Sequence, residues 1–399
     1  MRDLGEANAG FAALAEDAST VYSNPAGLAR LTSPEMVVGA VGIVPHSKYE
    51  DRGSLAVTTA AQTGTDDEGF AKAGMVGDLY FALPVDERVT LGLGVTSPFG
   101  ILIDYEPNWI GRYQATNSDV KSFDINPAVG IKLTDDISIG FGVSAQYFRA
   151  RLTNAVDVTA ILTSGAASGG LDGAADLTAD GWAVGFNAGI LANVTPKTRV
   201  GFHFRSKVEH DLDGTADFTI DPTALALMGG AFTDTTLTSS IDLPASYALS
   251  IHHQASDKLA LMASVLYTRW SSFKTLTVTY ANPLQPATVE QFNSDNTVRV
   301  AVGGRYQLTD NFSINAGIAF DQSPIADGFE TARIPDSDRY IGATGFSWTP
   351  RPGLSVDFAY QHIELAKLDI ARAGGQGDQL NGQYQAAAEL FGVSVRAQF

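Results

Sequence analysis

The 399-residue sequence contains no cysteine, six histidines, and only 26 lysines and arginines against 44 aspartates and glutamates. Without cysteine, a disulfide framework, a thiolate metal site and a thiol nucleophile are all excluded. The formal net charge of −18 argues against nucleic acid as a partner, because the basic stripe that neutralises phosphates is missing. Acidic residues gather in expected turns and loops, for example Asp66-Asp67-Glu68 and Asp135-Asp136, and this indicates a solvated surface.

Long apolar runs are missing as well. The longest uncharged stretch, 181–196, is interrupted by Asn187, Asn193 and several glycines. It falls short of the ~18 continuous apolar residues that a membrane-spanning helix needs. Met1-Arg2-Asp3 leads directly into polar sequence, so no signal peptide is predicted in this chain.

Signals of an enzyme are also lacking. The histidines show no metal-ligand spacing, and no serine stands in a nucleophile-elbow motif. We therefore expect no catalytic residues, no metal and no cofactor.

What the sequence does contain is a regular alternation of apolar and polar residues from Glu35 to the end of the chain. A period of two is typical of β-strands with two different faces. In 181–194 the apolar face carries Trp182, Val184, Phe186, Ala188, Ile190 and Val194. Runs such as 137–151 reach ~15 residues, well beyond the roughly 5–6 residues of strands in soluble sheets. With a rise of ~3.3 Å per residue and a tilt of about 40°, such a strand crosses ~35 Å, enough for a transmembrane barrel.

The segments between the strands fall into two alternating classes. Short polar turns are expected at 85–88, 134–136, 195–198, 255–257, 309–311 and 349–353, and long loops at 45–74, 154–180, 213–239, 273–294, 323–336 and 369–383. Short turns at one rim, long loops at the other and an even strand count are typical of outer-membrane barrels. A β-sandwich also alternates, but its dry core cannot hold the Arg, Lys and His of the polar faces without a large desolvation cost. The sequence therefore predicts an all-β fold, a transmembrane antiparallel β-barrel of about fourteen strands.

The first 34 residues do not share this alternation. They are rich in small residues and are broken by Asn24-Pro25-Ala26-Gly27. Pro25 fixes its own φ and keeps Asn24 out of the helical region, and Gly27 relaxes the backbone. Eight strands enclose a lumen that side chains fill, and fourteen leave a hole. We therefore expect residues 1–34 to form a compact plug inside a barrel made by residues 35–399.

The N-terminal sequence GEANAGFAALAEDASTVYSNPAGLARL resembles the hatch of the FadL/TodX family of outer-membrane transporters for long-chain fatty acids and other hydrophobic compounds. Similar segments follow in the family's order: SPFG at 97–100, WIGRYQ at 109–114, FRSKV at 204–208 and the stretch 318–340. The resemblance covers nearly the whole chain. It implies a fourteen-stranded barrel plugged by the hatch, with Asn24, Pro25, Ala26 and Gly27 at the gate, that captures ligands outside and releases them sideways into the membrane.

A proline interrupts the expected strand 89–103. Pro98 has no N–H, so it breaks one rung of the ladder and favours a kink. In a closed barrel a kinked strand opens a gap in the wall, and we expect Ser97, Pro98, Phe99 and Gly100 to form this lateral opening. An ordinary defect near a rim is the alternative.

Two of the long loops carry apolar side chains that need a reason to be there. The residues concerned are Ile161, Leu162, Leu225, Leu227, Met228 and Phe232. They either pack on one another as loop cores or form a greasy groove for ligand capture. Because the family's first, low-affinity site lies between these two loops, the resemblance favours the groove.

Arginines are expected on inward faces. Arg149 and Arg151 share one face of the fifth expected strand, and Arg205 and Arg299 belong to later strands. We expect the four to line a lumen pocket, where a guanidinium can grip a carboxylate; pairing with lumen acids is the alternative. The fatty-acid members of the family also use a lysine just before their tenth strand. The corresponding stretch here, 288–296, has no Lys or Arg, which leaves room for neutral hydrocarbons or aromatics.

Aromatic residues near strand ends, among them Trp270, Tyr340 and Tyr360, are expected to form the interfacial girdles of a membrane protein.

These observations predict uptake of hydrophobic small molecules across the bacterial outer membrane, and a general aqueous porin for small polar solutes is the alternative. The expected partners are a hydrophobic ligand such as a fatty acid or hydrocarbon, the lipid and lipopolysaccharide of the outer membrane, and detergent in crystals. Nucleic acid is not among them, and the protein is expected to be a monomer.

Overall fold

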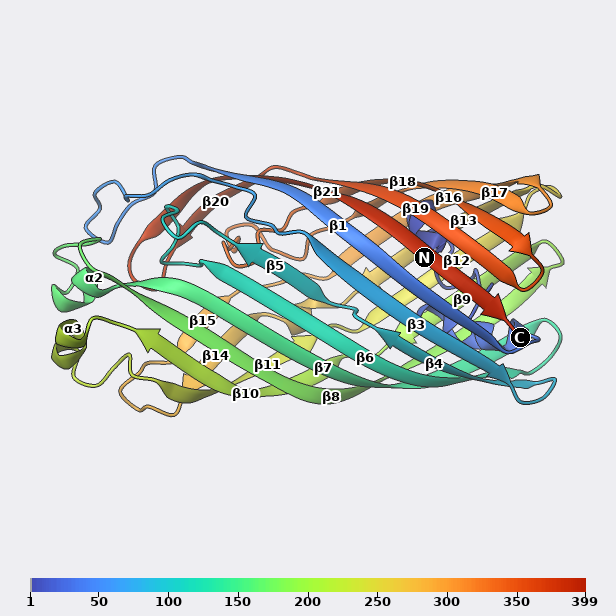
Figure 1. Ribbon diagram of the computed structural model, residues 1–399, viewed down its shortest axis with the longest axis horizontal. Coiled ribbons are helices and arrows are strands. Elements are labelled where there is room, and N and C mark those ends of the chain that lie inside the picture. Colours follow the sequence, from blue (N-terminus) through green and yellow to red (C-terminus); the bar gives the residue numbers. More distant parts are fainter. Residues whose placement is uncertain (1) are drawn as a thin grey trace.

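The structure, a computed structural model, describes residues 2–399 and is a closed antiparallel barrel of fourteen strands (Figure 1). The wall strands are, in order, β1 (Glu35–Asp51), β3 (Gly74–Pro84), β4 with β5 (Val89–Thr96, Gly100–Asp104), β6 (Asn117–Lys132), β7 (Ile137–Asp157), β8 (Asp172–Thr195), β9 with β10 (Thr198–Arg205, Val208–Thr219), β11 with β12 (Thr235–Leu243, Ser246–Gln254), β13 with β14 (Leu259–Thr268, Thr275–Tyr280), β15 with β16 (Thr288–Gln291, Thr297–Thr309), β17 (Phe312–Asp321), β18 (Arg339–Arg351), β19 with β20 (Leu354–Leu365, Leu368–Ala373) and β21 (Gln379–Gln398). The predicted fold class and strand number are confirmed.

Pairing between the first and last strands closes the barrel. β1 and β21 are in antiparallel register from Glu35 opposite Gln398 to Asp51 opposite Gly382. Short turns join the strands at one rim, and long loops join them at the other. The short strand β2 (Asp67–Glu68) lies in the first of these loops and pairs with β1.

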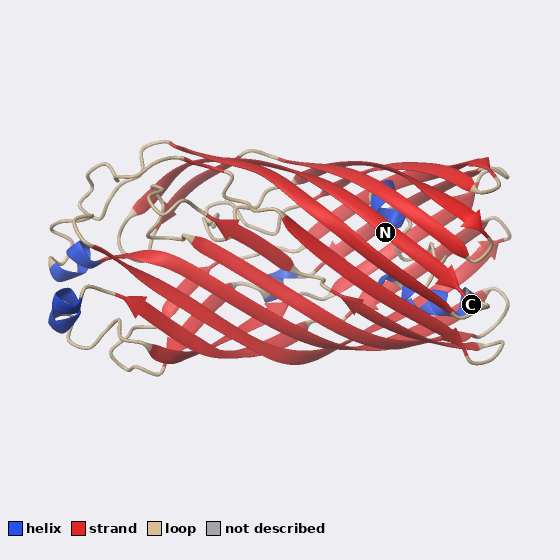
Figure 2. Ribbon diagram, viewed as in Figure 1, coloured by secondary structure: helices blue, strands red, loops and turns tan. Residues whose placement is uncertain are grey.

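Helices are few and short. They are η1 (Arg2–Glu6), α1 (Thr20–Ser23), η2 (Pro25–Arg30), α2 (Val158–Leu162), α3 (Pro222–Leu227) and η3 (Trp270–Ser272). Figure 2 shows α2 and α3 at the long-loop rim, and the N-terminal helices at the opposite end. Within residues 2–399, no helix has the length and apolar character to cross a membrane.

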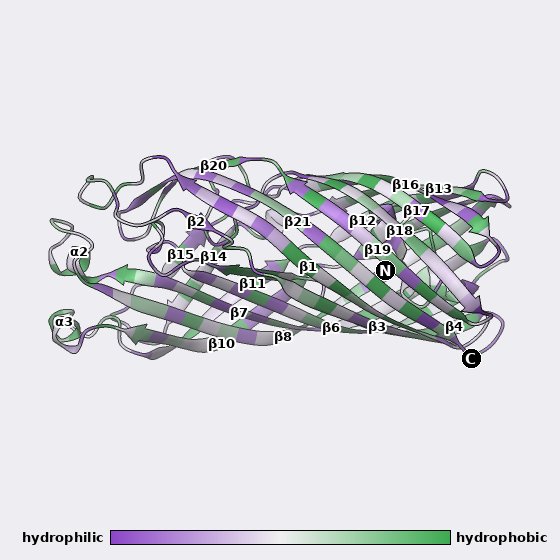
Figure 3. Cartoon of the chain, turned by 45° about the horizontal axis from the view of Figure 1, so that its top comes forward, coloured by the Kyte–Doolittle hydropathy of each residue, from purple (hydrophilic) through white to green (hydrophobic). Residues whose placement is uncertain are grey.

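Each wall strand has a buried face toward the lumen and an exposed face toward the outside. On β7, Phe148 is 2% exposed and points inward, whereas Phe141 is 47% exposed and points outward. Figure 3 shows the corresponding alternation of hydrophobic and hydrophilic residues along the strands. The exposed apolar side chains are those expected of a wall that faces lipid.

A row of aromatic residues marks one boundary of this apolar surface. Tyr147 lies between Phe123 and Trp182 in the strand register, all on the outer face. The row continues on later strands, where the ring centroids of Phe204 and Tyr247 are 5.0 Å apart. Aromatic girdles of this kind lie at the membrane–water interface.

The N-terminal segment, residues 2–34, lies inside the ring of strands near the short-turn rim (Figure 1). Asn24 fixes its fold, because its Nδ2 donates to the carbonyl oxygens of Ala12 at 2.7 Å and of Ile190 on β8 at 3.1 Å. Its Oδ1 accepts from the N–H of Ala26 at 3.1 Å and so caps η2.

Ion pairs also connect the N-terminal segment to β16, on a different part of the wall from β8. Arg305 on β16 donates from Nε to Glu6 at 2.8 Å and from Nη1 to Glu16 at 2.6 Å. Glu6 is fully buried, so replacing Arg305 with a neutral residue would remove a cationic partner from a carboxylate that lies out of water, which is costly.

Glycines in the wall let the N-terminal segment approach closely. A Cβ at Gly189 would come within 1.9 Å of Asn24 Oδ1, and one at Gly201 within 1.9 Å of the Ala12 carbonyl oxygen. Side chains at these positions would push the segment out of its seat, so the lumen glycines are required by its presence.

We predict that Gly189→Val displaces the N-terminal segment while the barrel stays folded. Liposomes containing the variant should swell in sugar solutions much faster than liposomes with the unchanged protein, and the folded band on an unheated gel should persist. Gly342→Val is the matched control, since a Cβ there meets nothing within 4 Å. Equal swelling for both variants would show that the segment does not seal the lumen.

Candidate ligand-binding site

A cavity of about 340 Å³ lies inside the barrel, between the N-terminal segment and the wall. Its lining includes Phe11, Tyr22, Pro98, Phe99, His203, Arg205, Trp270, Arg299 and Arg339. The cavity is thus bounded by the N-terminal segment, by the strand that carries Pro98 and by several other wall strands. Apolar rings and a few charged groups are the composition usual for a small-molecule site.

The predicted kink is present in the wall. β4 ends at Thr96 and β5 begins at Gly100, so Ser97, Pro98 and Phe99 belong to neither piece. β3 pairs with β4 only from Leu79 opposite Val95 downward, and the remaining upper part of β3 has no partner on β4 or β5 among the described pairings. The ladder between these neighbouring wall strands is therefore open beside the kink.

Ser122 of β6 holds the kink in place. Its Oγ accepts from the N–H of Phe99 at 2.8 Å and lies at 2.8 Å from the Phe99 carbonyl oxygen, to which it donates. The Phe99 ring packs against the buried cluster around Phe148 and Val208. Phe99 is therefore fixed as part of the cavity wall, and Gly100 follows it at the exposed side.

Two of the four predicted arginines line the cavity. Arg205 pairs with the buried Asp124 at 3.2 Å, and its guanidinium lies 4.4 Å from the centre of the Tyr22 ring. Arg299 Nη2 donates to the carbonyl of Ala7 at 3.2 Å. In the described part of the chain no carboxylate forms an ion pair with Arg299, and its buried Nε has no hydrogen-bond partner.

Arg149 and Arg151 require a correction, because the structure places both on the outer surface. They follow Phe141 and Tyr147 on the outward face of β7, and both are exposed. Arg151 forms a bidentate pair with Asp176 of β8, with contacts of 3.0 and 2.6 Å. The prediction was wrong because Tyr147 and Phe148 are adjacent and both aromatic. The sequence therefore does not show which of the two alternating sets of residues on β7 faces the lumen.

Polar cavity residues were also missed from the sequence. His203 is 2% exposed and its Nε2 has no partner within the described residues; its alternation with Phe202 and Phe204 was the available signal. Arg339 also faces the cavity and pairs with Asp321 at 3.2 Å and Asp336 at 2.5 Å. No local pattern distinguishes Arg339, because it lies at the first residue of β18 after a long loop.

The two apolar loops lie next to each other at the long-loop rim (Figure 2). Met228 and Phe232 pack against the buried cluster of Val156, Val158, Ala175 and Ala224. The remaining predicted side chains are Leu225, which is half-buried, and Ile161, Leu162 and Leu227, which are exposed. The loops thus contain both a packed core and an apolar outer surface.

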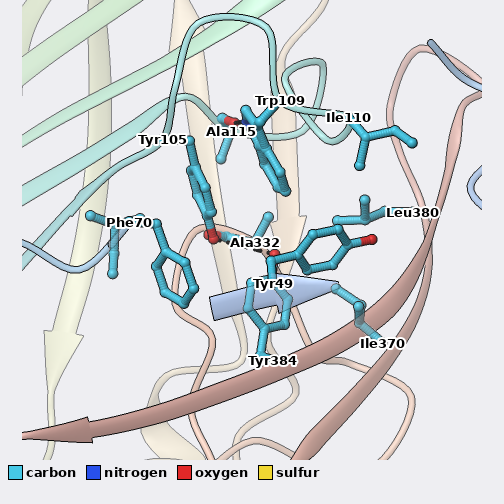
Figure 4. Close-up of a cluster of buried hydrophobic side chains, with 11 residues drawn as sticks. Tyr49, Phe70, Tyr105, Trp109, Ile110, Ala115, Ala332, Ile370, Leu380 and Tyr384 are labelled. Atoms are coloured by element: carbon cyan, nitrogen blue, oxygen red, sulfur yellow. Dashed lines mark hydrogen bonds between the residues drawn. The ribbon is translucent and has the colours of Figure 1, made fainter. Parts of the chain in front are cut away.

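Aromatic side chains fill another part of the long-loop half of the lumen (Figure 4). Tyr105 and Trp109 stack with ring centroids 3.8 Å apart, and Tyr49 and Tyr384 lie beside them at 4.8 Å from each other. Tyr105 donates to the carbonyl of Ala332 at 2.8 Å. Burial raises the pKa of the Tyr105 phenol, so this donor stays protonated. We call this cluster the aromatic cap.

Among the described residues, no group of three or more metal-ligating side chains is found.

A lipid-facing barrel with a filled lumen, short turns at one rim and long loops at the other defines an outer-membrane transport protein. The whole chain, residues 1–399, matches the family described as outer membrane protein transport protein (OMPP1/FadL/TodX), and the chain belongs to this family. It is accordingly a protein of the bacterial outer membrane. The family is made of transporters.

Individual relatives match this chain over more than nine-tenths of their own length. The chain is 28% identical to outer membrane protein P1 of Haemophilus influenzae, covering 99% of this chain and 93% of that protein. It is 26% identical to the long-chain fatty acid transport protein of Escherichia coli K12, with 99% and 92% covered.

Solved structures share the fold. A Pseudomonas aeruginosa FadL homologue has a TM-score of 0.92 at 22% identity, with 100% of this chain and 98% of that chain covered. The Ralstonia pickettii toluene transporter TbuX has a TM-score of 0.70 at 17% identity, with 99% and 98% covered.

We predict that Ser122→Ala loosens the kink. Loss of both contacts to Phe99 should cost ~1–3 kcal/mol locally, so hydrogen exchange at the Phe99 amide should accelerate by about fivefold or more. Ser118→Ala on the same strand is the control, because Ser118 is buried and its Oγ has no partner within the described residues. Unchanged exchange in Ser122→Ala would mean that other contacts hold the kink.

Proposed function

We propose that this protein takes up hydrophobic small molecules, with long-chain fatty acids as the foremost class and neutral hydrocarbons or aromatics as the second. The ligand is captured at the apolar surface of the α2 and α3 loops and passes into the cavity. It then leaves through the opening beside Ser97–Gly100. Residues 2–34 act as the hatch that keeps the lumen closed to water.

The observation that carries this proposal is the buried Nε donor of Arg299, which has no hydrogen-bond partner, in a cavity that is lined by aromatic rings together with polar and charged side chains. Asp321 lies opposite Arg299 in the register of β16 and β17 but is paired with Arg339. A buried N–H of a charged group without a hydrogen-bond partner is costly unless a ligand compensates. A carboxylate that enters the cavity would supply the missing charge and hydrogen bond.

The cavity is also suited to neutral ligands. The stretch 288–296 has no Lys or Arg, and Arg205 and Arg339 already have acidic partners. The names of the relatives include both a fatty acid transport protein and a toluene transporter. We therefore propose that Arg299 improves binding of anionic ligands and that the aromatic lining holds the apolar part of either class.

Release through the wall is favoured by the hydrophobic effect. An apolar chain gains roughly 25 cal/mol for each Å² kept out of water, so passage from the cavity into the lipid avoids a cost that release into an aqueous compartment would impose. Pro98 cannot donate to a neighbouring strand, and the open ladder beside it offers the route.

An aqueous porin is the competing function. It needs a continuous wet channel, whereas here Arg305, Glu6 and the wall glycines seat a compact segment in the lumen. The aromatic cap reduces the space further. These contacts favour a plugged transporter.

We predict that Arg299→Gln weakens binding of oleate by about 10- to 150-fold, which corresponds to the ~1.5–3 kcal/mol of a charged hydrogen bond. Binding of a neutral alkane or toluene should change by less than about threefold. Binding is measured by equilibrium dialysis of labelled ligand with purified protein. Arg149→Gln, on the outer surface, is the control and should bind as the unchanged protein does.

Two results would contradict the proposal. If Arg299→Gln weakens both ligand classes equally, the arginine is structural. If liposomes with the unchanged protein swell in small sugars as fast as liposomes with an open porin, the protein is an aqueous channel and the hatch does not close it.

A further inference from the structure

The ninth wall strand, β13 with β14, contains three more residues than the neighbouring strand, β11 with β12, in the interval between their two paired regions. β12 and β13 pair with Ser246 opposite Thr268. If this register continued upward, Ser239 would lie opposite Thr275, but the structure pairs Ser239 with Val278. No pairing joins Ser240–Pro244 to Trp270–Thr277 in the described chain. The excess is accommodated by the turn η3, Trp270–Ser272.

The inserted turn faces the kink across the lumen. Trp270 lines the same cavity as Pro98 and Phe99, and the rings of Trp270 and Phe99 meet edge to face with centroids 6.2 Å apart at 84°. Two irregular parts of the wall, from strands far apart in the sequence, are therefore in contact where the cavity adjoins the opening.

The two partners of this contact are held differently. Both backbone groups of Phe99 are bound by Ser122, so Phe99 is the fixed side. Trp270 stands on a three-residue turn outside the ladder, and the Ser271 N–H of this turn donates to Asn296 Oδ1 at 3.1 Å. The backbone of the turn is therefore held, but no hydrogen bond of the Trp270 indole is found among residues 2–399. By contrast, Trp109 in the aromatic cap donates from Nε1 to the carbonyl of Ala115 at 2.7 Å.

We propose that Trp270 is the inner gate of the lateral opening and sets which ligands pass through it. This inference rests on the proposed uptake function. In the closed state Trp270 packs on Phe99 and separates the cavity from the gap beside Gly100. Passage requires the Trp270 side chain to swing aside, because the Phe99 backbone is tied to β6 by Ser122. The free indole N–H donates to the acceptor group of a ligand that enters the contact.

A gate made of two rings favours slender ligands. An unbranched chain slips between the rings with a small displacement of the Trp270 side chain, whereas a fused-ring or branched molecule needs a larger one. Trp270 therefore discriminates by shape, and Arg299 by charge. Shortening the gate side chain should relax the first kind of selectivity and leave the second unchanged.

Trp270→Ala tests the gate through the ratio of two uptake rates. Cells or proteoliposomes are given labelled oleate and labelled pyrene-butyrate, a fused-ring acid. In Trp270→Ala the uptake of pyrene-butyrate relative to oleate should rise at least fivefold, while equilibrium binding of oleate to the purified protein stays within threefold. Trp182→Ala removes a tryptophan from the outer surface and is the control. A ratio unchanged from that of the control overturns the proposal.

A reversible cross-link between positions 99 and 270 tests the gate by a second route, in which the two positions are joined and released within one variant. The chain has no cysteine, so Phe99→Cys with Trp270→Cys introduces the sole thiol pair. Joining them with a disulfide-containing bismaleimide should stop oleate uptake without stopping oleate binding, and a reductant should restore uptake. Each single-cysteine variant should be unaffected by the reagent.

Uptake that continues through the cross-linked protein at the rate of the reduced protein would overturn the gate. Failure of the underlying function appears differently. In that case the unchanged protein takes up neither acid, whereas failure of the gate alone leaves uptake intact and insensitive to both tests.

Discussion

A closed cylinder of fourteen strands is too wide for the side chains of its own wall to fill. The positions of the N-terminal segment, the aromatic cap and the cavity all follow from the width of this lumen. The N-terminal segment occupies the half near the short turns, the aromatic cap occupies part of the half near the loops, and the cavity with Arg299 is the space between them. The site exists because the lumen is filled from both ends and left open in the middle.

The N-terminal segment is held in the lumen by close backbone contacts with the wall and by ion pairs, and not by large apolar side chains. Gly189 and Gly201 let the N-terminal chain lie directly on the wall, and Arg305 binds Glu6 and Glu16 from the opposite side. Close contact at several strands keeps the segment ordered without a large apolar core of its own. The charges near the cavity lie among buried side chains, in a low-dielectric setting where a single unpaired donor matters.

The barrel, its strand number and the kink at Ser97–Gly100 could be predicted from sequence, because period-two alternation and a strand proline are local signals. The inward or outward placement of a given side chain was less secure. A single extra residue exchanges the two faces of a strand, and adjacent aromatics such as Tyr147 and Phe148 conceal the parity. Arg205 and Arg299 were therefore placed correctly, and Arg149 and Arg151 were not.

Contacts that depend on register between distant strands could not be predicted at all. Trp270 was expected in an interfacial girdle because it stands near a strand end. It lines the cavity instead, because the inserted turn carries it inward. The insertion is revealed only by comparison of the two strand pairings on either side of it.

The seam between β1 and β21 has a consequence for biogenesis. The segment that fills the lumen immediately precedes β1, and its seats lie on β8, β9 and β16 in the middle and later parts of the chain. Once β1 and β21 have zipped along seventeen residues of β1, the wall is complete and the segment can no longer pass through it from the side. After closure the segment can reach its seats only through the open rim from which β1 starts, so a seam that closes early leaves a single route of entry.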